Sequence, residues 1–175
     1  WDGNGADPYE EKTGVKNIDL WTAPISTSTI THTLTPLTKT TVSRGGALIF
    51  SVEETNNSSS YYKFYFQAYG IKPDGTTLYS RRFSTDLKAG ETRKMRGVLR
   101  IPSSLELGTY NFGIKIIDTS GNLIDNDSFE FTVVSGTSYA LRSSARKLKR
   151  LMRNPDAQVV EEDGWKVIIV PEKDK

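Results

Sequence analysis

Hydrophobic and polar residues alternate along much of this chain, and the alternation has the period of two that is typical of β-strands. In residues 46–55 every second side chain is apolar, which predicts a strand that buries Leu48, Phe50 and Val52. The same pattern recurs in five further segments, at 61–71, 77–84, 92–101, 109–118 and 128–134. Glycine- or proline-containing turns such as KPDG, LKAG and TSGN separate them.

A threonine-rich segment at residues 22–43 predicts one more strand, which opens the series. Ile30, His32 and Leu34 alternate there with threonines, and Pro36 would place the strand at a sheet edge or bulge. The count reaches seven strands, and since each strand has one apolar face, two sheets must pack together. We therefore expect an all-β, seven-stranded immunoglobulin-like β-sandwich.

The segment LELGTYNFGIKIID indicates a more specific architecture. Its Leu-x-x-Gly-x-Tyr approach to a strand resembles the tyrosine corner of immunoglobulin-like sandwiches, in which Tyr110 would hydrogen-bond back to the backbone near Glu106. Residues 30–135 as a whole resemble bacterial and archaeal extracellular immunoglobulin-like modules, such as cell-adhesion-related domains. The resemblance implies a fold and an exported setting at the cell surface, outside the cell or in the periplasm.

Beyond the expected sandwich, the pattern changes to a helical one. Residues 139–155 place Leu141, Leu148 and Met152 on one helical face, and basic residues fill the other face. An Asp-Gly turn at 163–164 then predicts a β-hairpin that contains Trp165. A helix and hairpin of this size are too small to fold alone, so we expect them to dock on the sandwich or on a neighbouring subunit.

These patterns divide the chain into three parts. Residues 1–25 are expected to form an N-terminal arm, 26–136 the sandwich, and 137–175 a helix-plus-hairpin appendage. Tyr110, Leu141, Leu148, Met152 and Trp165 are the residues expected to have structural roles.

The composition narrows the kinds of ligand and site that the chain is expected to have. The 175 residues include 23 Lys and Arg against 21 Asp and Glu, so the formal charge of +2 gives no electrostatic reason to expect nucleic-acid binding. The chain has no cysteine and one histidine, His32, which we expect to be a buried, hydrogen-bonded ring rather than a metal ligand. No apolar run reaches the ~18 residues that a membrane span requires. We expect no cofactor and no metal, and the start at Trp1 is consistent with processing of an exported precursor.

No catalytic motif is present, and we expect no enzymatic activity. A hydrolase triad would need His32 as its base, in a threonine-rich strand. Asp118, Asp125 and Asp127 surround one predicted hairpin, where acids usually form turns. A hydrolase accessory domain is therefore the weakest of the functions considered.

Two surface features are candidates for binding. Tyr61, Tyr65 and Tyr69 would line the outer side of one strand and could stack on sugar rings or enter a protein interface. A basic row, Lys94, Arg96 and Arg100, would lie opposite Met95 and Leu99 in another strand and could meet an acidic partner.

The function that these observations favour is a non-enzymatic, exported surface or assembly module that acts through protein–protein contacts. Residues 15–25 and 165–171 are extended and apolar, and each could cap its own sheet or add as a strand to a neighbouring copy. Self-capping is favoured because it needs no partner. The alternative is a carbohydrate-binding module that uses the tyrosine row, with a polysaccharide as partner.

Overall fold

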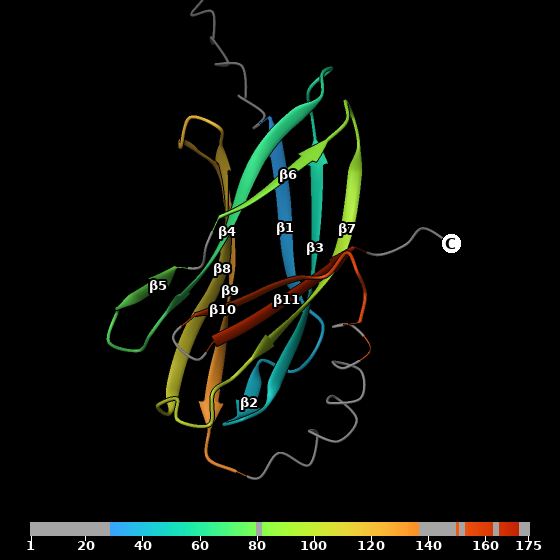
Figure 1. Ribbon diagram of the computed structural model, residues 1–175. Helices are drawn as coiled ribbons and strands as arrows, with labels where there is room; N and C mark the ends of the chain where they lie inside the picture. Colours follow the sequence, from blue (N-terminus) through green and yellow to red (C-terminus); the bar gives the residue numbers. More distant parts are fainter. Residues whose placement is uncertain (1–28, 80–81, 137–149, 151–152, 163–164, 172–175) are drawn as a thin grey trace, which may run out of the picture.

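The computed structural model describes residues 29–79, 82–136, 150, 153–162 and 165–171. They form an all-β structure of two sheets that enclose one hydrophobic core (Figure 1). Sheet A has the order β1-β3-β7-β11-β10, with bounds Ile30–Pro36, Ala47–Asn56, Thr92–Arg100, Trp165–Pro171 and Gln158–Glu162. Sheet B has the order β2-β9-β8-β4-β5, with β6 also paired to β4; the bounds are Thr41–Ser43, Leu123–Val134, Gly108–Asp118, Tyr62–Ile71, Thr77–Tyr79 and Phe83–Leu87.

The two-sheet, all-β prediction is confirmed, but the count of seven strands for the sandwich is not, because the described residues up to 136 form nine strands and the predicted hairpin adds β10 and β11. The threonine-rich segment forms two strands, β1 and β2, which residues 37–40 separate. Its second part, β2, pairs in parallel with β9 of the other sheet. The segment expected at 77–84 likewise divides into β5 and β6, which pair with opposite ends of β4.

The core consists of the side chains that the alternation places inward. Leu48, Phe50 and Val52 are at most 1% exposed, as predicted. Phe50 of sheet A contacts Phe112 of sheet B with ring centroids 5.1 Å apart, and Phe112 in turn lies 5.6 Å from Phe129. Gly97, beside Phe50 on β7, leaves the space that this ring occupies.

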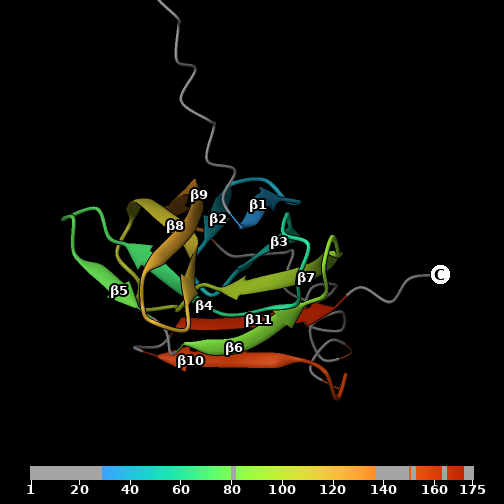
Figure 2. The ribbon, with the colours of Figure 1, turned by 90° about the horizontal axis from the view of Figure 1, so that it is seen from above.

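The predicted hairpin continues sheet A rather than standing apart from it. β11 pairs antiparallel with β7 of the same chain, and β10 lies beyond β11 at the edge of the sheet (Figure 2). Trp165 enters the core, where its ring contacts Tyr110 at 5.8 Å and Phe131 at 6.1 Å. Residues 165–171 therefore cap their own sheet, which is the arrangement favoured from the sequence.

The expected tyrosine corner is also present. The Tyr110 hydroxyl donates to the Glu106 carbonyl oxygen at 3.0 Å, and burial raises the pKa of this phenol. The ring stacks on Phe131 at 5.5 Å, so one residue both fixes the loop before β8 and packs the core.

The helix expected at 139–155 is not confirmed. Leu141, Leu148 and Met152 lie outside the described residues, as does the N-terminal arm at 1–25.

Gly97→Ala should destabilise the protein by about 1–3 kcal/mol, because its new Cβ would overlap the fully buried Phe50 ring. Gly70→Ala, also within a strand, is the matched control, since its nearest neighbour atom would be 3.8 Å away. Urea unfolding of the two variants measures the difference. Equal stabilities would show that the Phe50–Gly97 contact does not restrict the core.

Candidate interaction surfaces

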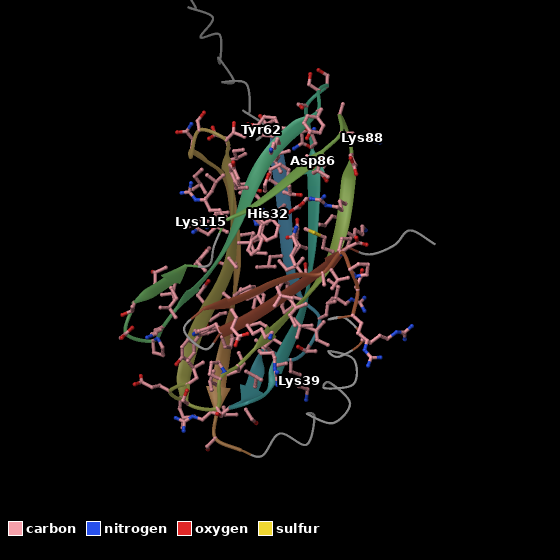
Figure 3. The ribbon with its side chains drawn as sticks, viewed as in Figure 1. His32, Lys39, Tyr62, Asp86, Lys88 and Lys115 are labelled. Atoms are coloured by element: carbon pink, nitrogen blue, oxygen red, sulfur yellow. The ribbon has the colours of Figure 1, made fainter. Side chains whose placement is uncertain are left out.

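A polar seam joins β1 of sheet A to β9 of sheet B. The side chain of His32 is fully buried; its Nδ1 lies 3.0 Å from Asp125 Oδ2 and its Nε2 lies 3.0 Å from the Ile114 carbonyl oxygen (Figure 3). The same Asp125 oxygen accepts the backbone N–H of His32 at 2.7 Å. Both ring nitrogens therefore lie within hydrogen-bond distance of an acceptor oxygen.

A second carboxylate extends the seam along β1. Asp127 Oδ2 accepts the backbone N–H of Leu34 at 2.7 Å. The expectation that His32 is a satisfied, buried ring is thus met, whereas Asp125 and Asp127 are not turn formers. Both lie within β9 and accept hydrogen bonds from the backbone of β1. Of the three acids only Asp118 holds a turn, where it accepts from the backbone of Ser120 and Asn122. The hydrogen bond from the Asn122 side chain, with those from the turn backbone, lowers the pKa of Asp118.

An ion pair lies between the sheets near the far end of β3. Arg93 Nη2 donates to Glu54 Oε2 at 2.7 Å and to Thr85 Oγ1 at 2.5 Å, which links β7 to β6 of sheet B. Glu54 is fully buried, and its other oxygen has no hydrogen-bond partner. Burial raises the pKa of Glu54, and the nearby Arg93 charge only partly offsets this effect. We assign these groups a role in stability, since their hydrogen-bonding atoms face one another inside the fold.

The tyrosine row is not uniformly exposed. Tyr61 is 60% exposed and Tyr65 is half-buried, but Tyr69 is only 7% exposed. Its ring lies against Gly113 on the neighbouring strand, and the Lys115 ammonium sits 5.3 Å from its centre. Tyr69 therefore does not present an exposed ring face. Gly113 has no side chain, so the tyrosine ring lies flat on the sheet there, and Lys115 lies over the ring.

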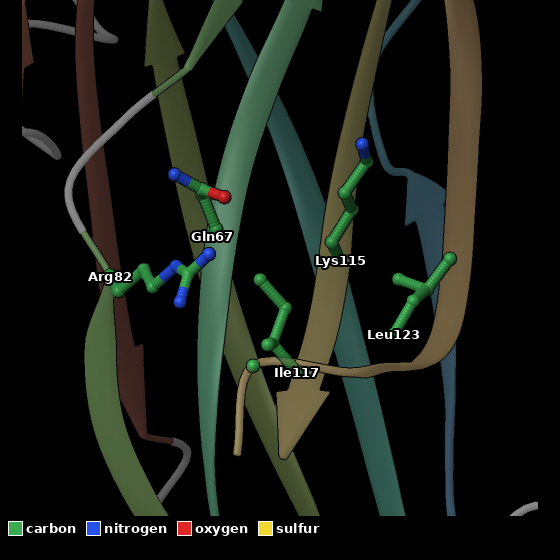
Figure 4. A pocket seen from close by; sticks show the side chains of 6 residues that line it. Gln67, Arg82, Lys115, Ile117 and Leu123 are labelled. Atoms are coloured by element: carbon green, nitrogen blue, oxygen red, sulfur yellow. The ribbon is translucent and has the colours of Figure 1, made fainter. Parts of the chain in front are cut away.

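A hollow of about 400 Å³ lies on the same outer face of sheet B, and we call it the sheet B hollow. It is lined by Gln67, Arg82, Lys115, Ile117, Gly121 and Leu123 (Figure 4). This grouping is not visible in the sequence. Gln67 and Lys115 become neighbours only through the β4–β8 register, and Arg82 belongs to the segment before β6.

The basic row of β7 divides into separate environments. Lys94 pairs with Glu53 at 3.0 Å, Arg96 is half-buried, and Arg100 is exposed. Between Arg96 and Arg100 lies Val98, only 3% exposed, in a second apolar cluster with Ile168 and Val170. These three basic residues consequently do not form one continuous cationic surface.

The edge of sheet A presents a different kind of surface. Within the described residues β10 pairs with β11 alone, and Val159 on it is 43% exposed. Beside it, the exposed Glu161 accepts from Lys166 of β11 at 3.0 Å. This is a short edge strand with one apolar and one acidic side chain facing solvent.

Two kinds of site are not found in the part of the chain that the structure describes. It contains no group of three or more His, Cys, Asp or Glu arranged to hold a metal ion. Nor does it contain a helix long and apolar enough to span a membrane.

Comparison with known proteins yields similarities of structure only. No protein-family model matches the chain, and no curated protein matches its sequence. Solved structures that resemble it include the CARDB domain of a Pyrococcus furiosus protein in complex with di-metal ions. That match has 14% identity and a TM-score of 0.47, and covers 61% of this chain and 94% of the domain.

Two other matches are parts of enzymes. The Pseudomonas fluorescens alkylpurine DNA glycosylase AlkC has 16% identity and a TM-score of 0.47, and a β-glucosidase from Listeria innocua has 18% and 0.43. They cover 62% and 60% of this chain, but only 31% and 16% of the enzymes. At such identities and scores, none of these likenesses bears on what this chain does.

Asp125→Ala should destabilise the protein more than Asp127→Ala. The first change removes the acceptor of three donors, namely the His32 ring, the backbone N–H of His32 and that of Asn126. The second removes the acceptor of two, the backbone N–H groups of Leu34 and Ser128. Each buried donor without a partner costs about 1–3 kcal/mol. Thermal and urea unfolding of the two variants test this ranking, and an equal loss would contradict the double role of Asp125.

Glu54→Gln should change how stability depends on pH. A carboxyl whose pKa is raised by folding stabilises the protein at pH values below its ordinary pKa, which is 4.5 for Glu. That contribution is lost as pH rises through the pKa of the folded state. The wild type should therefore lose stability relative to Glu54→Gln as pH rises above about 4.5. Urea unfolding across this range measures the difference, with Glu53→Gln as the exposed control. Parallel curves for wild type and Glu54→Gln would show that the pKa of Glu54 is not raised by folding.

Proposed function

We propose that this chain is a non-enzymatic module of an exported protein that binds a protein partner by strand addition at β10. The supporting observation is the edge of sheet A, where β10 has β11 as its described neighbour and Val159 is 43% exposed. An edge strand has a row of N–H and C=O groups that can pair with an extended segment of another chain. Backbone pairing provides affinity, and the side chains beside it provide selectivity.

The acidic residues of β10 indicate which charge its partner should have. Gln158–Glu162 contains two glutamates and no basic residue, and Glu161 is exposed. Two copies of β10 would bring these acids near one another, which opposes pairing of like edges. Val159 and Glu161 are two residues apart and so lie on one face of the sheet. We therefore propose a partner segment that has an apolar residue and a Lys or Arg two positions apart, on the same face.

The absence of catalysis and the exported setting are parts of the same proposal. His32, the only histidine in the sequence, has both ring nitrogens engaged in the seam, so it is not placed to act as a base. The cell-surface setting rests on the resemblance of residues 30–135 to extracellular modules.

A peptide-display selection against the folded protein tests strand addition. Peptides with an apolar and a basic residue two positions apart should be enriched. Val159→Asp should weaken their binding by about tenfold or more, because it puts a charge at the buried centre of the new interface. Leu107→Asp is the control, since Leu107 is similarly exposed, at 49%, but lies outside β10.

The same experiment distinguishes the carbohydrate alternative. If selected peptides bind Val159→Asp and wild type equally, strand addition at β10 is wrong. Binding on an oligosaccharide array that is lost in Tyr61→Ala and Tyr65→Ala would favour a carbohydrate-binding module instead.

A further inference from the structure

The sheet B hollow combines two cationic side chains with apolar walls. Cross-strand pairing places Gln67 beside Lys115 and Ile117 beside Leu123, so β4, β8 and β9 together form its floor. Arg82 reaches over this floor from the segment before β6, towards Ile117 (Figure 4). The hollow is thus assembled from four separate segments of the chain.

The positions of its two cations are fixed by neighbours. The Lys115 ammonium is held over the Tyr69 ring at 5.3 Å. The turn at Gly121 borders the guanidinium of Arg82, since a Cβ on this glycine would lie 3.9 Å from Arg82 Nη1. Within the described residues, Arg82 makes no hydrogen bond or ion pair. Its planar donor fork is suited to a carboxylate, with which guanidinium forms paired, charge-assisted hydrogen bonds.

The acid nearest in sequence is engaged elsewhere. Asp118 accepts from the backbone of Ser120 and Asn122 and from the Asn122 side chain, within its own turn. The lining of the hollow includes two cationic residues and no acidic one, so a ligand that enters it should be negative.

The walls indicate what accompanies that negative charge. Leu123 is 59% exposed beside the cations, and Ile117 forms a buried apolar floor. Burying Leu123 favours a ligand with an aliphatic group next to its acid. None of the six lining residues is aromatic, so the lining offers no ring on which a sugar could stack.

We infer that the sheet B hollow binds an acidic segment of a protein, with a Glu or Asp carboxylate on Arg82 and Lys115 and an adjacent apolar side chain on Leu123. This site is on the opposite sheet from β10 and takes the opposite charge. It is therefore independent of strand addition, and its test does not involve β10.

The test uses three probes: a peptide with the sequence acetyl-Gly-Leu-Glu-Glu-Leu-Gly-amide, its Gln-Gln counterpart, and trigalacturonate. Each is titrated into the ¹⁵N-labelled full chain while the NMR signals of the Arg82 Nε–H and the Gln67 side-chain amide are followed. The acidic peptide should shift both signals, and the glutamine peptide should not.

Two substitutions that remove the same charge provide the comparison. Arg82→Ala should raise the Kd of the acidic peptide by about tenfold, the expected effect of losing a charge-assisted hydrogen bond. Arg44→Ala, at an exposed arginine outside the hollow, should change it by less than about twofold. Leu123→Ala should also weaken binding if the apolar wall takes part.

Three results would overturn the inference. Equal weakening by Arg82→Ala and Arg44→Ala would mean that binding depends only on net charge. Trigalacturonate binding that requires Arg82, without peptide binding, would assign the site to an acidic sugar. No shift with any probe would mean that the hollow binds no carboxylate.

Discussion

The interaction on which the sandwich most depends is the bonding of β1 to β9 through carboxylates. β1 forms its backbone ladder with β3 on one side only, and its other side faces sheet B. Amide groups at that side would be costly if they lacked partners. Asp125 and Asp127 accept two of them, and so replace a missing strand with side-chain oxygens. These bonds join the two sheets along the side of β1 that does not face β3, where two stacked sheets would otherwise have no hydrogen bonds between them.

The opposite side of the sandwich is joined by different chemistry. There Arg93 links β7 to β6 through Glu54 and Thr85, and Trp165 fills the space against Tyr110 and Phe131. On the outer face of sheet B, Gly113 lets Tyr69 lie flat, and Tyr69 in turn supports Lys115. Because Lys115 lines the sheet B hollow, this outer-face contact helps to determine the shape of the hollow.

Alternation could predict the long strands because each has one buried face, as Leu48, Phe50 and Val52 demonstrate. It could not reveal β2, whose three residues are too few for a period to show. The outward position of Tyr69 was predicted from the same period, but exposure also depends on the residue opposite, and that requires the register. For the same reason Gln67, Arg82 and Lys115 could not be grouped from sequence. The sequence predicts turn formers at Asp125 and Asp127, because their acceptor role depends on β1, a strand remote in sequence.

The end of the β1–β3 ladder shows how a local hydrogen-bond network can affect the glycosylation of an asparagine. Asn56, which ends β3, is fully buried, and its Nδ2 lies within 2.8–3.2 Å of the carbonyl oxygens of Ser60, Leu87 and Lys88. It also begins an Asn-x-Ser sequence, the acceptor pattern for N-linked glycans. A glycan needs that same nitrogen, so this acceptor is closed once β3 and β4 have folded. Its neighbour Asn57 begins a second such sequence and is exposed. A cell that glycosylates this chain after folding would thus find its acceptors at Asn57 and at Asn126, which is also exposed and begins a third Asn-x-Ser sequence.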